Sequence, residues 1–211
     1  MNQVLNQAGL GEAQPLNDVL DDAALDQLFR SARSHNGWQK RPVAKELLEE
    51  AVNLAKLGPT AANTSPMRIL FIESEEGKER LKPALSPGNY EKTLTAPVVA
   101  VIAYDLEFYE KLPKLFPHTD ARAWFAGNDA FIQHTAAQSG TLEGAYFLLA
   151  LRAVGLDAGP INGFDNAKVD AEFFAGTTIR SNFIINIGYG DETKIFPRNP
   201  RLDFEEIARF A

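Results

Sequence analysis

The segment of residues 98–104, VVAVIAY, restricts the possible folds more than any other part of this chain. It is short, continuous and rich in β-branched residues, which is typical of a strand buried on both faces of its sheet. A sheet with such a strand must be covered by other elements on each side. The sequence therefore predicts a small sheet enclosed by helices.

The rest of the chain supplies mostly helices. Further strands are predicted at residues 67–74 and 182–189, and helices at 22–34, 44–58, 75–85, 134–154, 165–174 and after Asp203. Within the long helix, an apolar stripe is in register at Leu142, Tyr146, Leu149 and Ala153. Residues 105–130 are aromatic and irregular. No repeat or linker divides the chain, so we predict one α+β domain over residues 21–211, preceded by a mobile or loosely packed arm at 1–20.

The composition excludes several kinds of site. The 211 residues contain no Cys and three His, which rules out disulfides, thiolate zinc sites, iron–sulfur clusters and Cys nucleophiles and argues against a metal site. An enzyme built from this chain would therefore depend on an organic cofactor for demanding chemistry. The net charge of −7 argues against nucleic-acid or membrane-surface binding. No apolar run reaches the roughly 18 residues of a membrane span, and no signal peptide is found, so we expect a cytoplasmic protein.

Common catalytic and nucleotide-binding motifs are absent. There is no G-x-S-x-G, and Gly77-Lys78 lacks the preceding glycine of a phosphate-binding loop. Gly188-Tyr189-Gly190 follows a predicted strand but lacks the third glycine and the helix of a dinucleotide-binding fingerprint. These absences argue against the common hydrolase and nucleotide-binding classes.

Four short clusters carry groups suited to a bound anion or a flat ring. They are RSHN at 33–36, GPTAANTSP at 58–66, GNYEK at 88–92 and GLDAGPINGFD at 155–165. Guanidinium, amide and ammonium groups bind anions, and a Gly-Pro loop offers backbone N–H groups beside an apolar edge. Each cluster also has a purely structural interpretation, as a solvated helix end, a turn, a polar surface or a helix stop.

In this order and spacing, the clusters resemble the FMN-dependent nitroreductase family, from about Leu25 to the C-terminus. Within that family they resemble most the malonic semialdehyde reductases that form 3-hydroxypropionate and are associated with uracil breakdown. The motifs that carry this likeness are ARSHNGW at 32–38, GPTAANTSP at 58–66, EGKERLKPALSPGN at 76–89, FYEKLPKLFPHTDARAWF at 108–125, GLDAGPINGFD at 155–165 and NIGYGD at 186–191.

The resemblance implies a nitroreductase-like α+β fold, with a small, mostly antiparallel sheet flanked by helices. It also implies an intertwined homodimer with one FMN in each of two sites at the subunit interface. Arg33 and His35 match positions that hold the FMN phosphate and ribityl chain, and Arg201 matches a second phosphate-binding base. Asn89 and Lys92 match the pair beside the pyrimidine edge of the flavin ring.

Two further segments match family positions around the ring. Pro160, Ile161, Asn162 and Gly163 match a loop over the ring, whose backbone N–H groups approach O4 and N5. Thr60, Ala61 and Asn63 match a loop that reaches the FMN of the other subunit. The chain departs from the family pattern at Gly37, where many members have Lys or Arg, and at Ser65-Pro66-Met67, where Gln-Pro-Trp is usual.

The implied activity is a hydride relay in two steps. NAD(P)H would reduce FMN at N5 and leave, and N5 would then reduce malonic semialdehyde, so one site serving both substrates predicts ping-pong kinetics. No side chain then needs to act as a catalytic nucleophile, and Arg68 and Arg122 are candidates to bind the substrate carboxylate. The alternatives are a broad-specificity NAD(P)H nitroreductase or quinone reductase and, less favoured, a dimeric binding protein without flavin.

Overall fold

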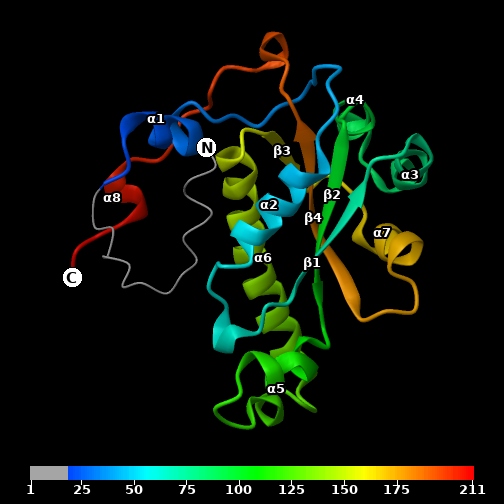
Figure 1. Cartoon of the computed structure of the whole chain (residues 1–211), viewed down its shortest axis with the longest axis vertical. Coiled ribbons are helices and arrows are strands. Elements are labelled where there is room, and N and C mark those ends of the chain that lie inside the picture. Colours follow the sequence, from blue (N-terminus) through cyan, green and yellow to red (C-terminus); the bar gives the residue numbers. More distant parts are fainter. Residues whose placement is uncertain (1–18) are drawn as a thin grey trace.

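A four-stranded antiparallel sheet forms the centre of the protein, in a computed structural model that describes residues 19–211. The strands lie in the order β1 (Met67–Ile72), β2 (Val98–Asp105), β4 (Ile179–Gly188) and β3 (Asp157–Ile161), as Figure 1 shows. The three strands predicted from sequence are confirmed. Every neighbouring pair is antiparallel, which agrees with the predicted α+β class.

The central strand β2 is buried on both faces, as its sequence predicts. Val98, Ala100 and Ile102 belong to one apolar cluster, whereas the alternate residues Val99, Val101 and Ala103 belong to another. Successive side chains of a strand point to opposite faces. The uninterrupted apolar run therefore contributes to two cores at once.

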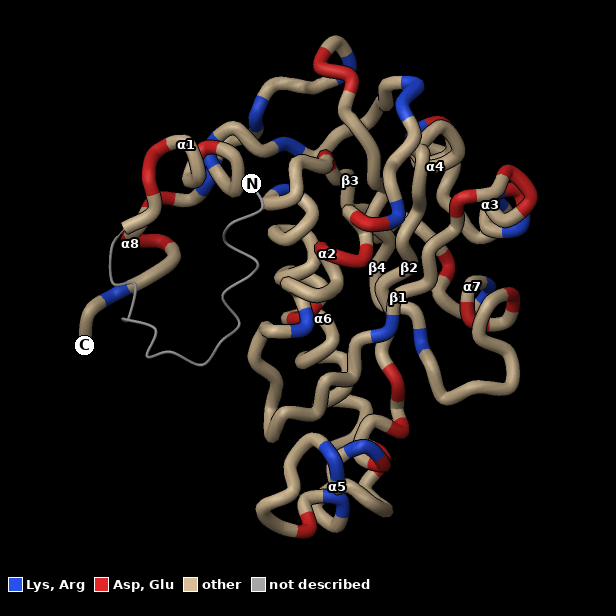
Figure 2. Tube along the Cα trace, viewed as in Figure 1, with Lys and Arg blue, Asp and Glu red and all other residues tan. Residues whose placement is uncertain are grey.

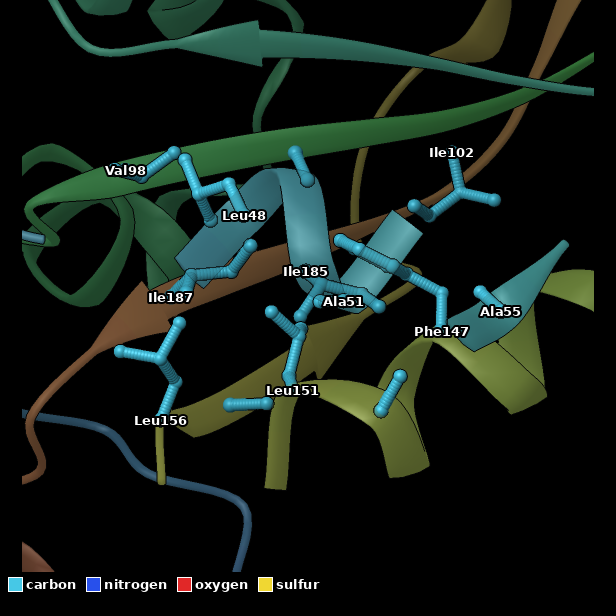
Figure 3. Close-up of a cluster of buried hydrophobic side chains, with 13 residues drawn as sticks. Leu48, Ala51, Ala55, Val98, Ile102, Phe147, Leu151, Leu156, Ile185 and Ile187 are labelled. Atoms are coloured by element: carbon cyan, nitrogen blue, oxygen red, sulfur yellow. The ribbon is translucent and has the colours of Figure 1, made fainter. Parts of the chain in front are cut away.

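Helices α2 (Lys45–Ala55) and α6 (Asp129–Ala153) cover one face of the sheet. Leu48 of α2 and Phe147 and Leu151 of α6 pack against Ile185 of β4 (Figure 3). Burial of one such Leu or Phe side chain contributes about 1.5–3 kcal/mol. This layer fixes α6 across the sheet, and both ends of α6 lie beside segments predicted to form the site.

Three shorter helices lie along the other face. They are α3 (Glu75–Leu81), α4 (Tyr90–Leu94) and α7 (Asn166–Phe173). Leu81 and Val169 pack there against the second face of β2. Asp165 caps α7 as predicted, because its side chain accepts a hydrogen bond from the Lys168 backbone N–H.

The predicted apolar stripe of the long helix flanks its buried face instead of coinciding with it. The helix begins at Asp129, five residues before the predicted start, and turns Ile132, Ala136, Phe147 and Leu151 inward. Leu142 and Tyr146 stay 44% and 39% exposed. The helix is apolar on more than one side, so periodicity alone does not indicate which side meets the sheet.

The prediction of a loop at residues 155–165 is wrong for the central part of this segment. Asp157–Ile161 forms β3, an edge strand in which Pro160 pairs with Ile185 and Ile161 with Ile184. Proline is tolerated at a sheet edge, where the missing N–H interrupts no internal ladder. The prolines and glycines of this segment therefore predicted a turn where the chain completes the sheet.

The remaining helices are short and lie at the ends of the layers. The first predicted helix is only α1 (Asp22–Leu25) with a π-helical turn through Arg30, so its predicted extent to residue 34 is wrong. Helix α5 is Leu112–Leu115, and α8 (Phe204–Ile207) begins with the predicted capping box of Asp203 and Glu206. The predicted N-terminal arm falls mostly on residues 1–18, outside the described residues.

Within residues 19–211, no helix has the length and apolarity to cross a bilayer. No three His, Asp or Glu side chains of this part of the chain gather where they could hold a metal ion.

Candidate functional site

Four arginines line a cavity of about 450 Å³ where the loop after α1 meets the C-terminal segment. They are Arg33, Arg152, Arg198 and Arg201. Figure 2 shows Lys and Arg positions along these segments, near α1. Phe29 and Phe196 add apolar surface to the same walls. The fold thus gathers basic side chains in a chain whose net charge is −7.

Backbone carbonyls position these arginines. Arg33 donates to the Phe196 carbonyl oxygen, and Arg198 Nη2 donates to the carbonyls of Arg30 and Ala32 at 2.7 and 2.9 Å. Arg152 Nη1 donates to the Leu28 carbonyl at 2.8 Å. Burial and the neighbouring charge of Arg198 lower the pKa of Arg152. These bonds orient the guanidinium groups, and the charge of Asp157 only partly offsets the lowering of the Arg152 pKa.

An anion fits this arrangement better than any neutral group. Within residues 19–211, none of the four arginines forms an ion pair with a carboxylate. Guanidinium groups bind phosphate oxygens through charge-assisted hydrogen bonds. The structure therefore brings together Arg33 and Arg201, as the sequence predicts, and adds Arg152 and Arg198, which the sequence reasoning missed. The only local signal for Arg198 is its position three residues before Arg201.

A second cavity, of about 550 Å³, adjoins the first. Asn36 and Phe196 line both, and Lys92 lines the second. Lys92 Nζ lies 3.5 Å from Asn36 Oδ1, so the predicted ring-side cation is adjacent to the arginine cavity. An elongated ligand with a phosphate at one end and an electron-rich ring at the other matches this distribution of charge.

Asn89 and Gly163, predicted to lie beside and over the ring, contact each other directly. Asn89 Nδ2 donates to the Gly163 carbonyl at 2.8 Å, and the Ser86 N–H donates to the same oxygen at 2.9 Å. A Cβ at position 163 would lie 2.3 Å from Asn89 Nδ2, so only glycine permits this approach. Asn162 is exposed, whereas Ile161 packs in the core.

The His35 side chain lies outside the arginine cavity. It is buried, with Nε2 3.3 Å from Asp157 Oδ1, and packs so closely on Gly190 that a Cβ there would overlap its ring. Its neighbours Arg33, Ser34 and Asn36 line the cavity. The imidazole thus holds the loop after α1 against β3, and the predicted contact of His35 with FMN remains a prediction.

The contact between His35 and Asp157 is expected to make the stability of the protein depend on pH. The hydrogen bond from His35, supported by the Gly190 N–H, holds the pKa of Asp157 below its usual value. A carboxyl group whose pKa is lower in the folded than in the unfolded protein stabilises the fold at pH values above the ordinary Asp pKa. This stabilisation is lost as the pH falls through the pKa of the group in the folded protein. Asp157→Asn is therefore expected to lower the urea midpoint at pH 7, with the difference from the unmodified protein shrinking below about pH 4. A difference independent of pH between 7 and 3 would contradict this.

Thr60, Ala61 and Asn63 lie at the far end of α6 from the arginine cavity. Asn63 Nδ2 donates to the Leu115 carbonyl at 2.8 Å, which ties this loop to α5, whereas α1 lies beside the other end of α6 (Figure 1). None of the three lines either cavity. Within one copy of the chain, the structure does not bring this loop to the other residues predicted to bind FMN.

The two candidate carboxylate ligands already have carboxylate partners. Arg68 Nη2 lies 2.8 Å from Asp105, and Arg122 makes two hydrogen bonds of 2.8 and 2.6 Å to Glu110. Burial raises the pKa of Asp105, but hydrogen bonds from Thr178 and the Glu107 N–H and the charge of Arg68 lower it overall. The hydrogen bonds and charge of Arg122 lower the pKa of Glu110. Neither arginine lines the two cavities described above.

Comparisons with known proteins agree with this fold. A Burkholderia lata protein with the provisional name NADH dehydrogenase/NAD(P)H nitroreductase is 61% identical over 90% of this chain and 98% of its own length. A nitroreductase family protein from Streptococcus pneumoniae has the same fold, with a TM-score of 0.78 at 21% identity over 88% of this chain and 98% of the other.

A provisionally named nitroreductase from Exiguobacterium sibiricum, solved in complex with FMN, superposes equally well. Its TM-score is 0.78 at 19% identity, over 92% of this chain and 99% of its own. The model of the nitroreductase family matches residues 29–189. This match covers most of the chain, including the sheet and the loop that carries Arg33, and the chain therefore belongs to the nitroreductase family.

Proposed function

We propose that this chain is an FMN-dependent NAD(P)H oxidoreductase that reduces malonic semialdehyde to 3-hydroxypropionate. Membership of the nitroreductase family and the NAD(P)H nitroreductase name of a 61% identical relative support the oxidoreductase class. The observation that carries the cofactor assignment is the cavity lined by four arginines without carboxylate partners among residues 19–211. The malonic semialdehyde subgroup rests on the sequence motifs.

The residues of the two adjoining cavities would divide the binding of FMN between them. Arg33 and Arg201 would hold the phosphate, with Arg152 and Arg198 adding positive charge. Lys92 would lie near the pyrimidine edge, where reduction of the flavin places negative charge. Bound FMN would supply the centre that accepts hydride from NAD(P)H and donates it to the aldehyde. The protein would orient the flavin and the substrate and exclude water.

A homodimer would complete this site. Thr60, Ala61 and Asn63 lie away from both cavities of their own chain, so in the proposed dimer they would contact the FMN of the second copy. Apolar side chains are also exposed on α6 and along the C-terminal segment, including Phe131, Leu142, Phe204, Ile207 and Phe210. Clustered exposed apolar residues mark interaction surfaces. We propose that a second copy covers them.

The absorption spectrum of the pure protein tests the cofactor. We expect a bound flavin, retained or taken up from added FMN, that is bleached by NADH or NADPH under anaerobic conditions. Testing the two nicotinamides separately determines the preference between them. A colourless protein that binds no added FMN would overturn the proposal and favour a flavin-free binding protein.

Arg122 remains the better candidate for the substrate carboxylate. Its side chain is 45% exposed, whereas Arg68 is held by Asp105 and two backbone carbonyls. Arg122→Ala is expected to raise KM for malonic semialdehyde about tenfold, because a charge-assisted hydrogen bond contributes about 1.5–3 kcal/mol. KM for an uncharged quinone should stay unchanged. Equal effects on both substrates would remove Arg122 from this role.

A second candidate function is a broad-specificity NAD(P)H nitroreductase or quinone reductase. The pairing of Arg68 with Asp105 and of Arg122 with Glu110 favours it, because each cation would have to exchange its carboxylate partner for the carboxylate of the substrate. The ratio of kcat/KM for malonic semialdehyde to that for a nitroarene separates the two functions. A ratio well above one supports the aldehyde reductase, and a ratio well below one supports the broad reductase.

A further inference from the structure

The loop of residues 60–66 adopts an unusual backbone conformation. Ala62, Asn63 and Ser65 have φ angles of 48°, 51° and 40°, although none of them is glycine. A non-glycine residue in this left-handed region costs about 1–2 kcal/mol. Three such residues within four positions persist only if surrounding contacts hold the loop.

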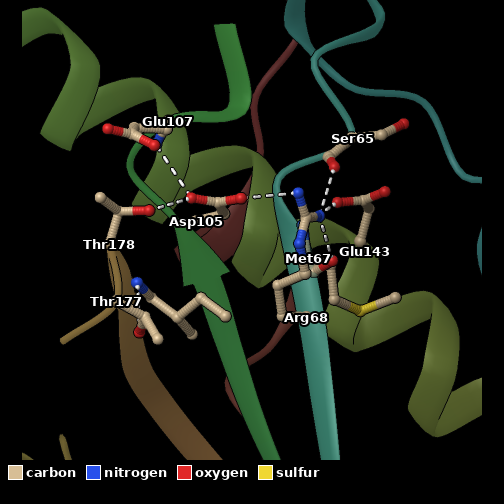
Figure 4. Close-up of polar contacts among 9 residues, drawn as sticks. Ser65, Met67, Arg68, Asp105, Glu107, Glu143, Thr177 and Thr178 are labelled. Carbon is tan, nitrogen blue, oxygen red and sulfur yellow. Dashed lines mark hydrogen bonds and ion pairs between the residues drawn. The ribbon is translucent and has the colours of Figure 1, made fainter. Parts of the chain in front are cut away.

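A buried carboxylate of α6 supplies one of these contacts. Glu143 is 2% exposed, and its Oε2 accepts a hydrogen bond of 2.9 Å from the Met67 N–H, where the loop enters β1 (Figure 4). One turn earlier on the same helix, Ser139 Oγ accepts from the Ala61 N–H at 3.4 Å. Helix α6 thus contacts the loop at both of its ends.

Arg68 and Asp105 hold the same junction from the sheet. Arg68 Nη1 donates to the carbonyls of Ser65 and Met67 at 3.2 and 2.8 Å, and its Nη2 donates to Asp105 (Figure 4). The Asp105 N–H in turn donates to the Pro66 carbonyl at 3.0 Å. Glu143 holds the Met67 N–H from the helix, on the side of the junction away from these sheet contacts.

Burial of a carboxyl group between α6 and the sheet is energetically unfavourable. Burial raises the pKa of Glu143, because the loss of hydration outweighs the Met67 N–H, the charge of Arg68 and the Ser65 hydroxyl, which lower it. The neighbouring helix positions are Gly140 and Gly144, where a Cβ would lie 3.0 and 2.7 Å from Tyr104 and Phe183, so α6 lies close against the sheet. An apolar side chain would pack here without the desolvation cost. The acceptor oxygen, and not the bulk of the side chain, accounts for a glutamate at this position.

We propose that Glu143 is a positioning residue that fixes the 60–66 loop, through the Met67 N–H, in the conformation that presents Thr60, Ala61 and Asn63 to the FMN of a second copy of the chain. The inference rests on the proposed function, since the loop has a role in flavin binding only in an FMN-dependent homodimer. It adds a residue from the interior of α6 that no sequence motif indicates.

Three variants test the role of the acceptor. Glu143→Gln keeps a carbonyl oxygen for the Met67 N–H, Glu143→Met keeps the length without the oxygen, and Glu143→Ala removes both. For Met and Ala we expect FMN binding about tenfold weaker in titrations followed by flavin fluorescence, and a shifted flavin absorption spectrum. The Gln variant should match the unmodified protein in both FMN affinity and flavin absorption spectrum. Near-normal binding by the Met and Ala variants, or failure of Gln to restore it, would overturn the inference.

Amide hydrogen exchange of the unliganded protein tests the loop independently of FMN. Exchange at residues 61–67 should accelerate at least tenfold in Glu143→Met and stay unchanged in Glu143→Gln. An unchanged rate in the Met variant would refute the role of Glu143 even if the protein binds FMN. Failure of the unmodified protein to bind FMN, with accelerated exchange in the Met variant, would instead refute the proposed function and leave the loop-holding role established.

Asp170→Ala is a matched control. Asp170 Oδ1 accepts from the Ser181 N–H of β4 at 2.7 Å, so it also joins a helix carboxylate to a strand N–H, but from α7 on the other face of the sheet. We expect a lower melting temperature with FMN affinity and exchange at 61–67 unchanged. Equal weakening of FMN binding by Asp170→Ala and Glu143→Met would show that general destabilisation, and not loop position, accounts for the effect.

Discussion

Replacement of both Arg33 and Arg201 by Ala is expected to weaken FMN binding by about 100-fold or more. The two guanidinium groups lie in one cavity without carboxylate partners among residues 19–211, so a phosphate would be their principal counter-charge. Each charge-assisted hydrogen bond contributes about 1.5–3 kcal/mol, and 1.4 kcal/mol corresponds to tenfold in affinity. Titration of the flavin-free protein with FMN gives the dissociation constants.

Arg30→Ala is the appropriate control for this double variant. Arg30 lies three residues before Arg33, but it pairs with Asp22 at 2.7 Å and does not line the cavity. Its replacement should leave FMN affinity within about twofold of the unmodified protein, since exposed ion pairs contribute at most about 1 kcal/mol to stability and this one touches no ligand. If the double variant binds FMN as tightly as the control, the arginine cavity is not the phosphate site.

A second large effect is expected at the exposed side of α6. Replacement of Leu142 and Tyr146 by Asp should convert a homodimer to monomers, because a buried unpaired charge costs about 3–5 kcal/mol. That cost corresponds to a dimer dissociation constant raised by about 100-fold or more. Sedimentation equilibrium measures the change in mass. FMN affinity should fall with it, because the 60–66 loop of a second copy no longer reaches the site.

As a control, Ala171→Asp introduces one aspartate on α7, at an exposed position on the opposite face of the sheet. We expect it to leave both the mass and the FMN affinity unchanged. If the α6 variant stays dimeric, this face of α6 lies outside the interface. If it is monomeric and still binds FMN tightly, each site is complete within one chain.

The positions of Arg33 and Lys92 show how far the sequence alone describes the site. The order of the motifs predicted that both would approach one ligand, and the structure places them in adjoining cavities that share Asn36 and Phe196. Arg152 and Arg198 were not predicted. Arg152 lies in the last turn of an apolar helix, where a cation also stabilises the helix end, and nothing local distinguishes the two roles.

The Pro160–Gly163 segment shows a different limit. Local composition predicted a loop because glycine and proline usually mark turns, whereas Pro160 and Ile161 pair with β4 at the edge of the sheet. Whether such a segment joins a sheet depends on an edge strand with free hydrogen-bonding groups nearby. The residues of the segment itself do not indicate whether such a partner strand lies nearby.

Local signals in the sequence were enough to predict several elements and the class of fold that they form. The doubly buried strand β2, the capped helices α7 and α8 and the α+β class follow from residue spacing and capping chemistry. The packed chain was needed to see which charges converge, which side of α6 meets the sheet, and that Glu143 accepts from the Met67 N–H. These contacts join residues far apart along the chain, and their energies depend on burial and distance, which exist only after the chain has packed.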